Sequence, residues 1–230
     1  MKKSIMVFSV LVGFVLLPLA RADVMPNLTL PPMDGNGFAL GSYTSPEQYH
    51  ALYDSVFRFN TAIHYNWASS FAPPAYGFTD THSFNSDVHL IGGAYSPNGG
   101  GTWIPVGDIY APALTTVRIT GVGPLDYSTE MLGLNITAST PLGTVLIRES
   151  PTLASTGHTT LTAVSGGYTV DSFFDVFTEI SLDGGNSWIP DSLGPVHVLY
   201  ECPEPGTTSI GLLGLGLAGL LRMHRRSRKS

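Results

Sequence analysis

The chain has 230 residues, a single cysteine and a formal net charge of −6, from 11 basic and 17 acidic side chains. One cysteine excludes an intramolecular disulfide, so the fold has to be stabilised by its core. Eight of the basic residues lie in the first 21 and the last nine positions. Residues 23–202 therefore keep three arginines and no lysine against 16 acidic residues, a formal charge of −13 that excludes nucleic acid and anionic membranes as partners.

The N-terminus has the order of features that is typical of a secretory signal peptide. Lys2 and Lys3 form a positive region, residues 5–19 are apolar, and Ala20-Arg21-Ala22 has small residues at the two flanking positions of a cleavage site. We expect a signal peptide over residues 1–22 with cleavage after Ala22. An uncleaved N-terminal anchor is the alternative.

Residues 23–45 are rich in proline, glycine and asparagine and predict an irregular lead-in. The next segment predicts the one helix of the domain, over residues 45–59. Ser45 fits the N-cap, Pro46 the first helical position, and Gln48 completes a capping box. Apolar residues then recur at helical spacing: Tyr49, Leu52, Tyr53 and Val56.

From residue 71 onward the pattern changes to short strands separated by turn residues. The segments 117–120, 131–137, 144–148 and 196–200 are rich in β-branched and apolar residues. The clearest strand covers residues 173–182, where one face carries Phe174, Val176, Thr178, Ile180 and Leu182. We expect a mainly β, β-sandwich-like ectodomain over residues 23–202, built as one or two domains.

Two segments of the chain repeat each other. The segment from Ser96 to Trp103 reads SPNGGGTW, and the segment from Ser181 to Trp188 reads SLDGGNSW, 85 residues later. The repeat predicts an internal duplication, with halves near 71–120 and 143–202. Both segments resemble the Asp-box motif of secreted β proteins, with Asn98 replacing the aspartate in the first copy and Asp183 retaining it in the second. The resemblance implies structural hairpin turns that Trp103 and Trp188 anchor as buried side chains, away from any catalytic centre.

The C-terminus combines three features in a fixed order. Pro203-Glu204-Pro205 is followed by an uncharged apolar run over residues 210–221, which is shorter than a full membrane span. The last positions carry five cations that suit the cytoplasmic side of a membrane: Arg222, Arg225, Arg226, Arg228 and Lys229. The alternative is a buried glycine-rich core helix.

This tail resembles the PEP-CTERM sorting signal of Gram-negative bacteria. The resemblance covers residues 203–230 and implies transient anchoring in the inner membrane through this segment alone. It also implies processing near Pro203-Glu204-Pro205 by an exosortase-like enzyme and release to the cell surface or extracellular matrix.

The remaining chemistry-bearing residues are scattered. Six histidines lack the close spacing of a zinc site: His50, His64, His82, His89, His158 and His197. His82 and His89 could converge with Asp80 and Asp87 across strands, although surface histidines are the simpler interpretation. Several aromatic residues in or beside expected loops could stack on sugars or cover sheet edges: Tyr43, Tyr65, Trp67, Tyr76 and Tyr95.

No nucleophile motif or phosphate loop is present in the sequence. We therefore expect a non-catalytic surface or matrix protein without cofactor or metal, associated with extracellular polysaccharide. The alternative is a secreted glycan-acting hydrolase whose carboxylate pair the sequence does not locate.

Overall fold

The computed structural model describes residues 24–46 and 51–202, so the expected signal peptide and the whole sorting tail lie outside the described residues. The described chain forms thirteen β-strands and no α-helix, which confirms the mainly β class. The strands are β1 (Ser42–Thr44), β2 (Ala51–Tyr53), β3 (Phe57–Phe59), β4 (Thr61–Tyr65), β5 (Thr79–Tyr95), β6 (Ile104–Gly123), β7 (Asp126–Thr140), β8 (Gly143–Glu149), β9 (Ser155–Val164), β10 (Gly167–Val176), β11 (Thr178–Ser181), β12 (Ile189–Pro190) and β13 (Val196–Glu201).

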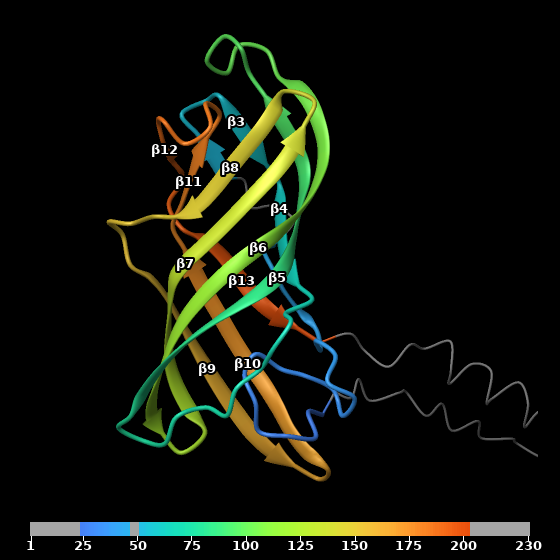
Figure 1. Ribbon diagram of the computed structural model, residues 1–230, viewed down its shortest axis with the longest axis vertical. Helices are drawn as coiled ribbons and strands as arrows, with labels where there is room; N and C mark the ends of the chain where they lie inside the picture. Colours follow the sequence, from blue (N-terminus) through green and yellow to red (C-terminus); the bar gives the residue numbers. More distant parts are fainter. Residues whose placement is uncertain (1–23, 47–50, 203–230) are drawn as a thin grey trace, which may run out of the picture.

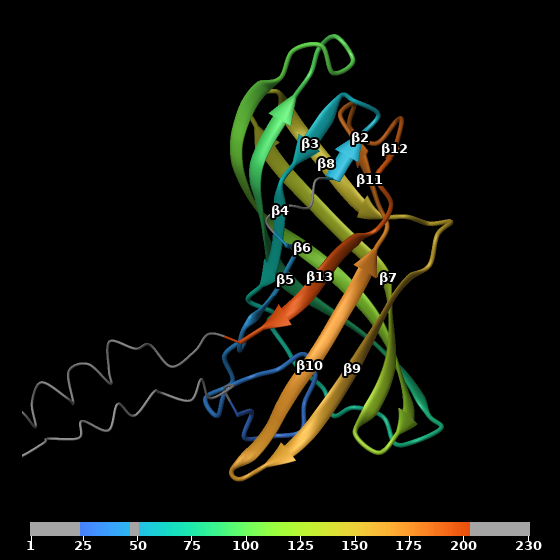
Figure 2. The same cartoon turned by 180° about the vertical axis from the view of Figure 1, so that it is seen from behind.

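Eight of these strands form a closed ring in which each is paired with two antiparallel neighbours. Around the ring the order is β1, β4, β5, β6, β7, β9, β10 and β13, and β13 pairs with β1 again. The protein is therefore an eight-stranded barrel, and the expected β-sandwich is wrong. Figure 1 and, from behind, Figure 2 show the strands wrapping around the long axis of the molecule.

The barrel closes because its central strands are long and bent. β6 runs for 20 residues, and its inward residues alternate with exposed ones from Ile109 to Ile119. Irregularities in the ladder at Leu90/Gly93 and at Thr116/Val117 add local twist, which helps a sheet to curl. The sequence indicated only residues 117–120 of this strand, because Gly, Pro and Thr interrupt the apolar run.

The barrel is extended at its upper end in Figure 1 by the remaining five strands. β7 continues beyond β9 to pair with β8, and β5 continues beyond β4 to pair with β3. In one extension β11 pairs with β8 and β12 pairs with β11, and in the other β2 pairs with β3. An isolated antiparallel bridge between Tyr53 and Asp191 joins the two extensions.

The expected helix over residues 45–59 is wrong where the chain is described, since β2 and β3 form a hairpin there; residues 47–50 lie outside the described part. Asp54 and Ser55 have φ of 44° and 57°, the left-handed geometry of a tight hairpin turn. The Ser45 hydroxyl, expected as an N-cap, instead accepts the N–H of Ala62 at 2.8 Å. Pairing of β3 with β5 overrides the helical spacing of the apolar residues.

The strand pairing of the first half of the chain recurs in the second half. Each half contains four runs, where a run is one strand or two strands that follow each other in the chain. From Ser42 to Gly123 the runs are β1–β2, β3–β4, β5 and β6. From Asp126 to Glu201 they are β7, β8–β9, β10–β11 and β12–β13. Each run pairs with the next, and the last run of each half pairs with the first run of the other. These bounds differ from 71–120 and 143–202, and a common origin of the halves stays a prediction.

The N-terminal lead-in packs against the lower half of the barrel. Met25 is fully buried and forms a bridge with Tyr168 at the start of β10. The indole N–H of Trp67, which is 2 % exposed, donates to the Pro32 carbonyl oxygen at 2.5 Å. The lead-in therefore belongs to the core despite its irregular backbone.

Candidate functional site

The turn between β11 and β12 is closed by the side chain of Asp183. Its Oδ1 accepts the N–H of Ser187 at 2.9 Å and the hydroxyl of Ser181 at 2.8 Å, and its Oδ2 accepts the Ser187 hydroxyl at 2.5 Å. The Gly185 N–H donates to the Ser181 hydroxyl oxygen at 2.8 Å. These bonds, led by that from the Ser187 hydroxyl, lower the pKa of Asp183 to about 2. The carboxylate is thus ionised at neutral pH, and both of its oxygens accept hydrogen bonds from within the turn.

The turn between β5 and β6 repeats this arrangement with an amide oxygen. Oδ1 of Asn98 accepts the N–H of Thr102 at 2.8 Å and the hydroxyl of Ser96 at 3.0 Å. The Gly100 N–H donates to the Ser96 hydroxyl oxygen at 2.8 Å. In both turns, two consecutive glycines have positive φ: Gly99 (65°), Gly100 (93°), Gly184 (74°) and Gly185 (93°). Glycine adopts positive φ more readily than any residue with a side chain, which accounts for the Gly-Gly pair in both copies.

An arginine stacks on the tryptophan at the end of each turn. The guanidinium carbon of Arg58, on β3, lies 4.2 Å from the ring centroid of Trp103. That of Arg148, on β8, lies 3.9 Å from the ring centroid of Trp188. β3 and β8 hold equivalent places in the two halves, so the pairs repeat with the turns. Sequence reasoning missed them, although residues 23–202 have only three arginines.

The two indoles are half-buried, so the expected burial is only partial, and their role as anchors of the turns stays a prediction. A guanidinium covers part of each ring in place of the core. Both rings lie just outside the regular strands, since Trp103 directly precedes β6 and Trp188 directly precedes β12. Replacing either ring therefore removes less apolar contact than replacing a core side chain.

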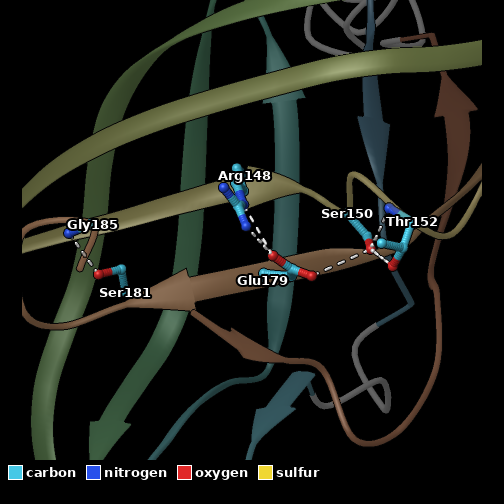
Figure 3. A network of polar contacts seen from close by, with 6 residues as sticks. All are labelled: Arg148, Ser150, Thr152, Glu179, Ser181 and Gly185. Carbon is cyan, nitrogen blue, oxygen red and sulfur yellow. Dashed lines mark hydrogen bonds and ion pairs between the residues drawn. The ribbon is translucent and has the colours of Figure 1, made fainter. Parts of the chain in front are cut away.

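Arg148 is also held by an ion pair, drawn in Figure 3. Its Nε and Nη2 lie 2.9 Å and 2.7 Å from Oε2 of Glu179, a residue of β11. The Ser150 hydroxyl donates to the other carboxylate oxygen at 3.4 Å. The side chains of Arg148 and Glu179 are 32 % and 13 % exposed. Since Ser181 follows Glu179 on the same strand, this pair ties the second turn to β8.

A pocket of about 280 Å³ lies beside the second turn. It is lined by Trp188, Ile189, Pro190 and Ser192 on one side and by Asp54 on the other. Asp54 belongs to the turn between β2 and β3, so the pocket lies where the two extensions of the barrel meet. Sequence reasoning did not identify it, because its walls come from opposite ends of the chain.

His82 and His89 do not converge with the aspartates of their strand. His82 lies on the inner side of β5, stacked on Phe71 with 4.0 Å between ring centroids. His89 lies on the outer side, where its Nε2 is 3.2 Å from Oδ2 of Asp108. Within residues 24–46 and 51–202, the structure contains no group of three metal-ligating side chains.

His64 points into the barrel, between two apolar interior cavities of about 50 Å³ each. Its Nε2 lies 2.6 Å from the Ser86 hydroxyl oxygen. Burial lowers the pKa of His64 to about 4, so the ring is neutral at physiological pH. A neutral imidazole bonded to a hydroxyl, inside an apolar cavity of this size, is a structural core residue.

The aromatic residues expected beside loops fall into two groups. Tyr43 and Trp67 are core residues, 8 % and 2 % exposed, and Tyr65 and Tyr95 are half-buried. Tyr76 is 72 % exposed. Of these five, Tyr76 alone presents most of its ring to solvent, so the group does not form one stacking surface.

The tail that the sequence marked as a sorting signal, with Pro203, Glu204 and Pro205 and its terminal cations, lies outside the described residues. The family model of the PEP-CTERM protein-sorting motif matches residues 201–226. The match confirms a PEP-CTERM sorting motif in the expected place, and its first residue, Glu201, is the last residue of β13. Such a motif marks an exported protein whose C-terminus is a sorting signal.

Comparisons with curated proteins and with solved structures found no match. Among the described residues, no helix has the length and hydropathy needed to cross a membrane.

Proposed function

We propose that this chain is an exported, non-catalytic protein of the cell surface or extracellular matrix of a Gram-negative bacterium. An exosortase-like enzyme would process its tail near Pro203-Glu204-Pro205. The observation that carries the proposal is the sorting motif at residues 201–226, directly after the last barrel strand. The segment before the motif already folds as a closed barrel, so release of the tail leaves the ring of strands intact.

We further propose that the barrel is retained in the matrix by extracellular polysaccharide. The charge of −13 over residues 23–202 keeps copies soluble and repels anionic polymers, which favours neutral glycans as partners. The two turns are proposed to be Asp-box turns with a structural role, which the hydrogen bonds within each turn support.

Intact-mass analysis of protein recovered from the native surface tests the sorting part of the proposal. The expected mass lacks both the residues before Asp23 and the cationic end after the Pro-Glu-Pro tripeptide. Recovery of full-length tails on surface protein would refute processing. A deletion strain compared with a complemented strain then tests retention, through the amount of protein left in the washed matrix.

A secreted glycan hydrolase is the second candidate, because one glutamate has the character of a general acid. Burial, together with the charges of Glu130 and Glu179, raises the pKa of Glu149, while the Ser155 hydroxyl opposes the shift. A carboxyl of raised pKa beside other carboxylates is a feature of glycosidase acids. Chromogenic glycosides and the host polysaccharide test this alternative. Cleavage that Glu149→Gln abolishes would establish it and refute the non-catalytic proposal.

A further inference from the structure

The pocket beside the second turn has the chemistry of a sugar site. Trp188, Ile189 and Pro190 supply the apolar part of its lining. The Arg148 guanidinium, 3.9 Å from the ring centroid, limits the freedom of the indole to reorient. Aromatic rings held in this way stack on the C–H face of a pyranose through the same apolar surface that suits them to wet interfaces.

The rim of the pocket is polar and open to hydroxyl groups. Asp54 is exposed on its turn and forms no hydrogen bond or ion pair with the rest of the described chain. Its carboxylate can accept two hydroxyl protons. Ser192 donates its own proton to the Leu52 carbonyl oxygen at 2.6 Å, which leaves the hydroxyl oxygen as an acceptor. Donating hydroxyls on a ligand therefore match both rim groups.

The pocket is built on fixed backbone. Oδ1 of Asp191 accepts the N–H of Leu52 at 3.1 Å and that of Leu193 at 3.0 Å. The N–H of Ser192 donates to the Leu52 carbonyl oxygen at 2.8 Å. These bonds join the walls across the seam between β2 and β12, so the ligand meets a preorganised site.

The charges around the pocket select among sugars. Asp54 is the charged side chain in its lining, and the nearby Arg148 is engaged by Glu179 at 2.7 Å. A carboxylated or sulfated sugar would meet a carboxylate without a free cation to offset it. The volume, about 280 Å³, lies near the lower end of small-molecule pockets and suits one ring rather than several.

We propose that the pocket between Asp54 and Trp188 binds one neutral pyranose unit of a glycan chain, with the ring on the indole and its hydroxyls on Asp54. The inference rests on the proposed retention by polysaccharide and names the site that would provide it. The equivalent indole, Trp103, is stacked by Arg58 in the same way and supplies a matched control.

The test uses the exported protein recovered from the native surface, and isothermal titration with neutral oligosaccharides of glucose, galactose and mannose, with oligogalacturonate as the acidic comparison. We expect at least one neutral oligosaccharide to bind in the millimolar to high micromolar range, and the acidic one to bind at least tenfold more weakly. Asp54→Asn, which suits the positive φ of this position, and Trp188→Leu should each weaken binding at least tenfold. Trp103→Leu should leave it unchanged.

The variants also separate this site from the wider function. Binding that survives both Asp54→Asn and Trp188→Leu, or equal binding of the acidic oligosaccharide, would overturn the site. So would a wild-type protein that binds none of the neutral probes. Matrix retention is measured independently in the strain complemented with the wild-type gene. If the wild-type protein is not retained there, the proposed function itself is refuted. Melting temperatures identify a variant that has lost its fold, and Asp54→Asn decides the matter if Trp188→Leu is unfolded.

Discussion

The two arginine–tryptophan pairs differ in one feature, which allows the contribution of an ion pair to be measured inside one molecule. Arg148 stacks on Trp188 and also binds Glu179, whereas Arg58 has the stacking contact with Trp103 and no ion pair in the described structure. We expect Arg148→Leu to destabilise the barrel much more than Arg58→Leu does. Leucine keeps the aliphatic part of the side chain, so both substitutions remove mainly the guanidinium.

The expected magnitudes follow from the contacts. Loss of a partly exposed cation–π contact costs about 0.5–1 kcal/mol, which is the whole of the change for Arg58→Leu. In Arg148→Leu the Glu179 carboxylate, 13 % exposed, also loses two charge-assisted hydrogen bonds. Loss of such bonds costs about 1.5–3 kcal/mol, discounted because Arg148 is one-third exposed. The total for Arg148→Leu is therefore about 2–3 kcal/mol.

Urea denaturation of both variants at neutral pH measures the difference in the free energy of unfolding. The double variant Arg148→Leu/Glu179→Leu should recover most of the loss, since it removes the unpaired carboxylate together with its partner. Equal losses in the two single variants, or no recovery in the double variant, would refute the reasoning. The first result would mean that stacking dominates, and the second that Glu179 is stabilised by other groups.

Three further predictions follow. The pKa of Asp183 is about 2 in the folded chain against 3.8 in the unfolded one, so its contribution to stability is present above pH 3.8 and is lost as the pH falls toward 2. Between pH 5 and pH 2, the melting temperature of Asp183→Asn should therefore fall less than that of the wild type. An equal fall in the two proteins would contradict this. Gly157→Ala should destabilise the barrel by about 1–3 kcal/mol in urea denaturation, because its Cβ would clash with the Phe173 carbonyl oxygen, while Gly133→Ala, with 3.8 Å to its nearest neighbour, should be tolerated. Trp188→Ala should cost about 2 kcal/mol, less than a buried tryptophan, because its ring is half-buried; a loss above 4 kcal/mol in the same assay would indicate deeper burial.

The strands could be predicted from the sequence wherever burial alternates without interruption. Phe174, Val176, Thr178 and Ile180 are all buried, as the period of two indicated. The single expected strand is divided at Phe177, between the end of β10 and the start of β11. Ring closure was not predictable, because the seam between β13 and β1 rests on three residue pairs. The helix prediction was wrong because the spacing of four apolar residues also fits a hairpin whose two turn residues have positive φ.

The candidate site was only partly visible in the sequence. Asn98 and Asp183 could be identified as turn acceptors, since each sits two residues after a serine and before two glycines. The pairing of Arg148 with Trp188 and the pocket at Asp54 depend on contacts between distant strands, which no local pattern encodes. The sorting tail was the reverse case, because a linear sorting motif is a sequence pattern that can be identified without the fold.

Closure of the ring has a consequence for crowded surroundings. A protein with an open sheet exposes unpaired N–H and C=O groups along its edge strands, and these groups template aggregation when many copies meet. Here each strand of the ring is paired on both sides, from β1 round to β13. The ring itself therefore offers a neighbouring copy no free edge strand, and most of the charges in residues 23–202 have the same sign. Closure thus removes one route to aggregation from the ring, and the shared sign of the charges opposes close approach where copies are concentrated.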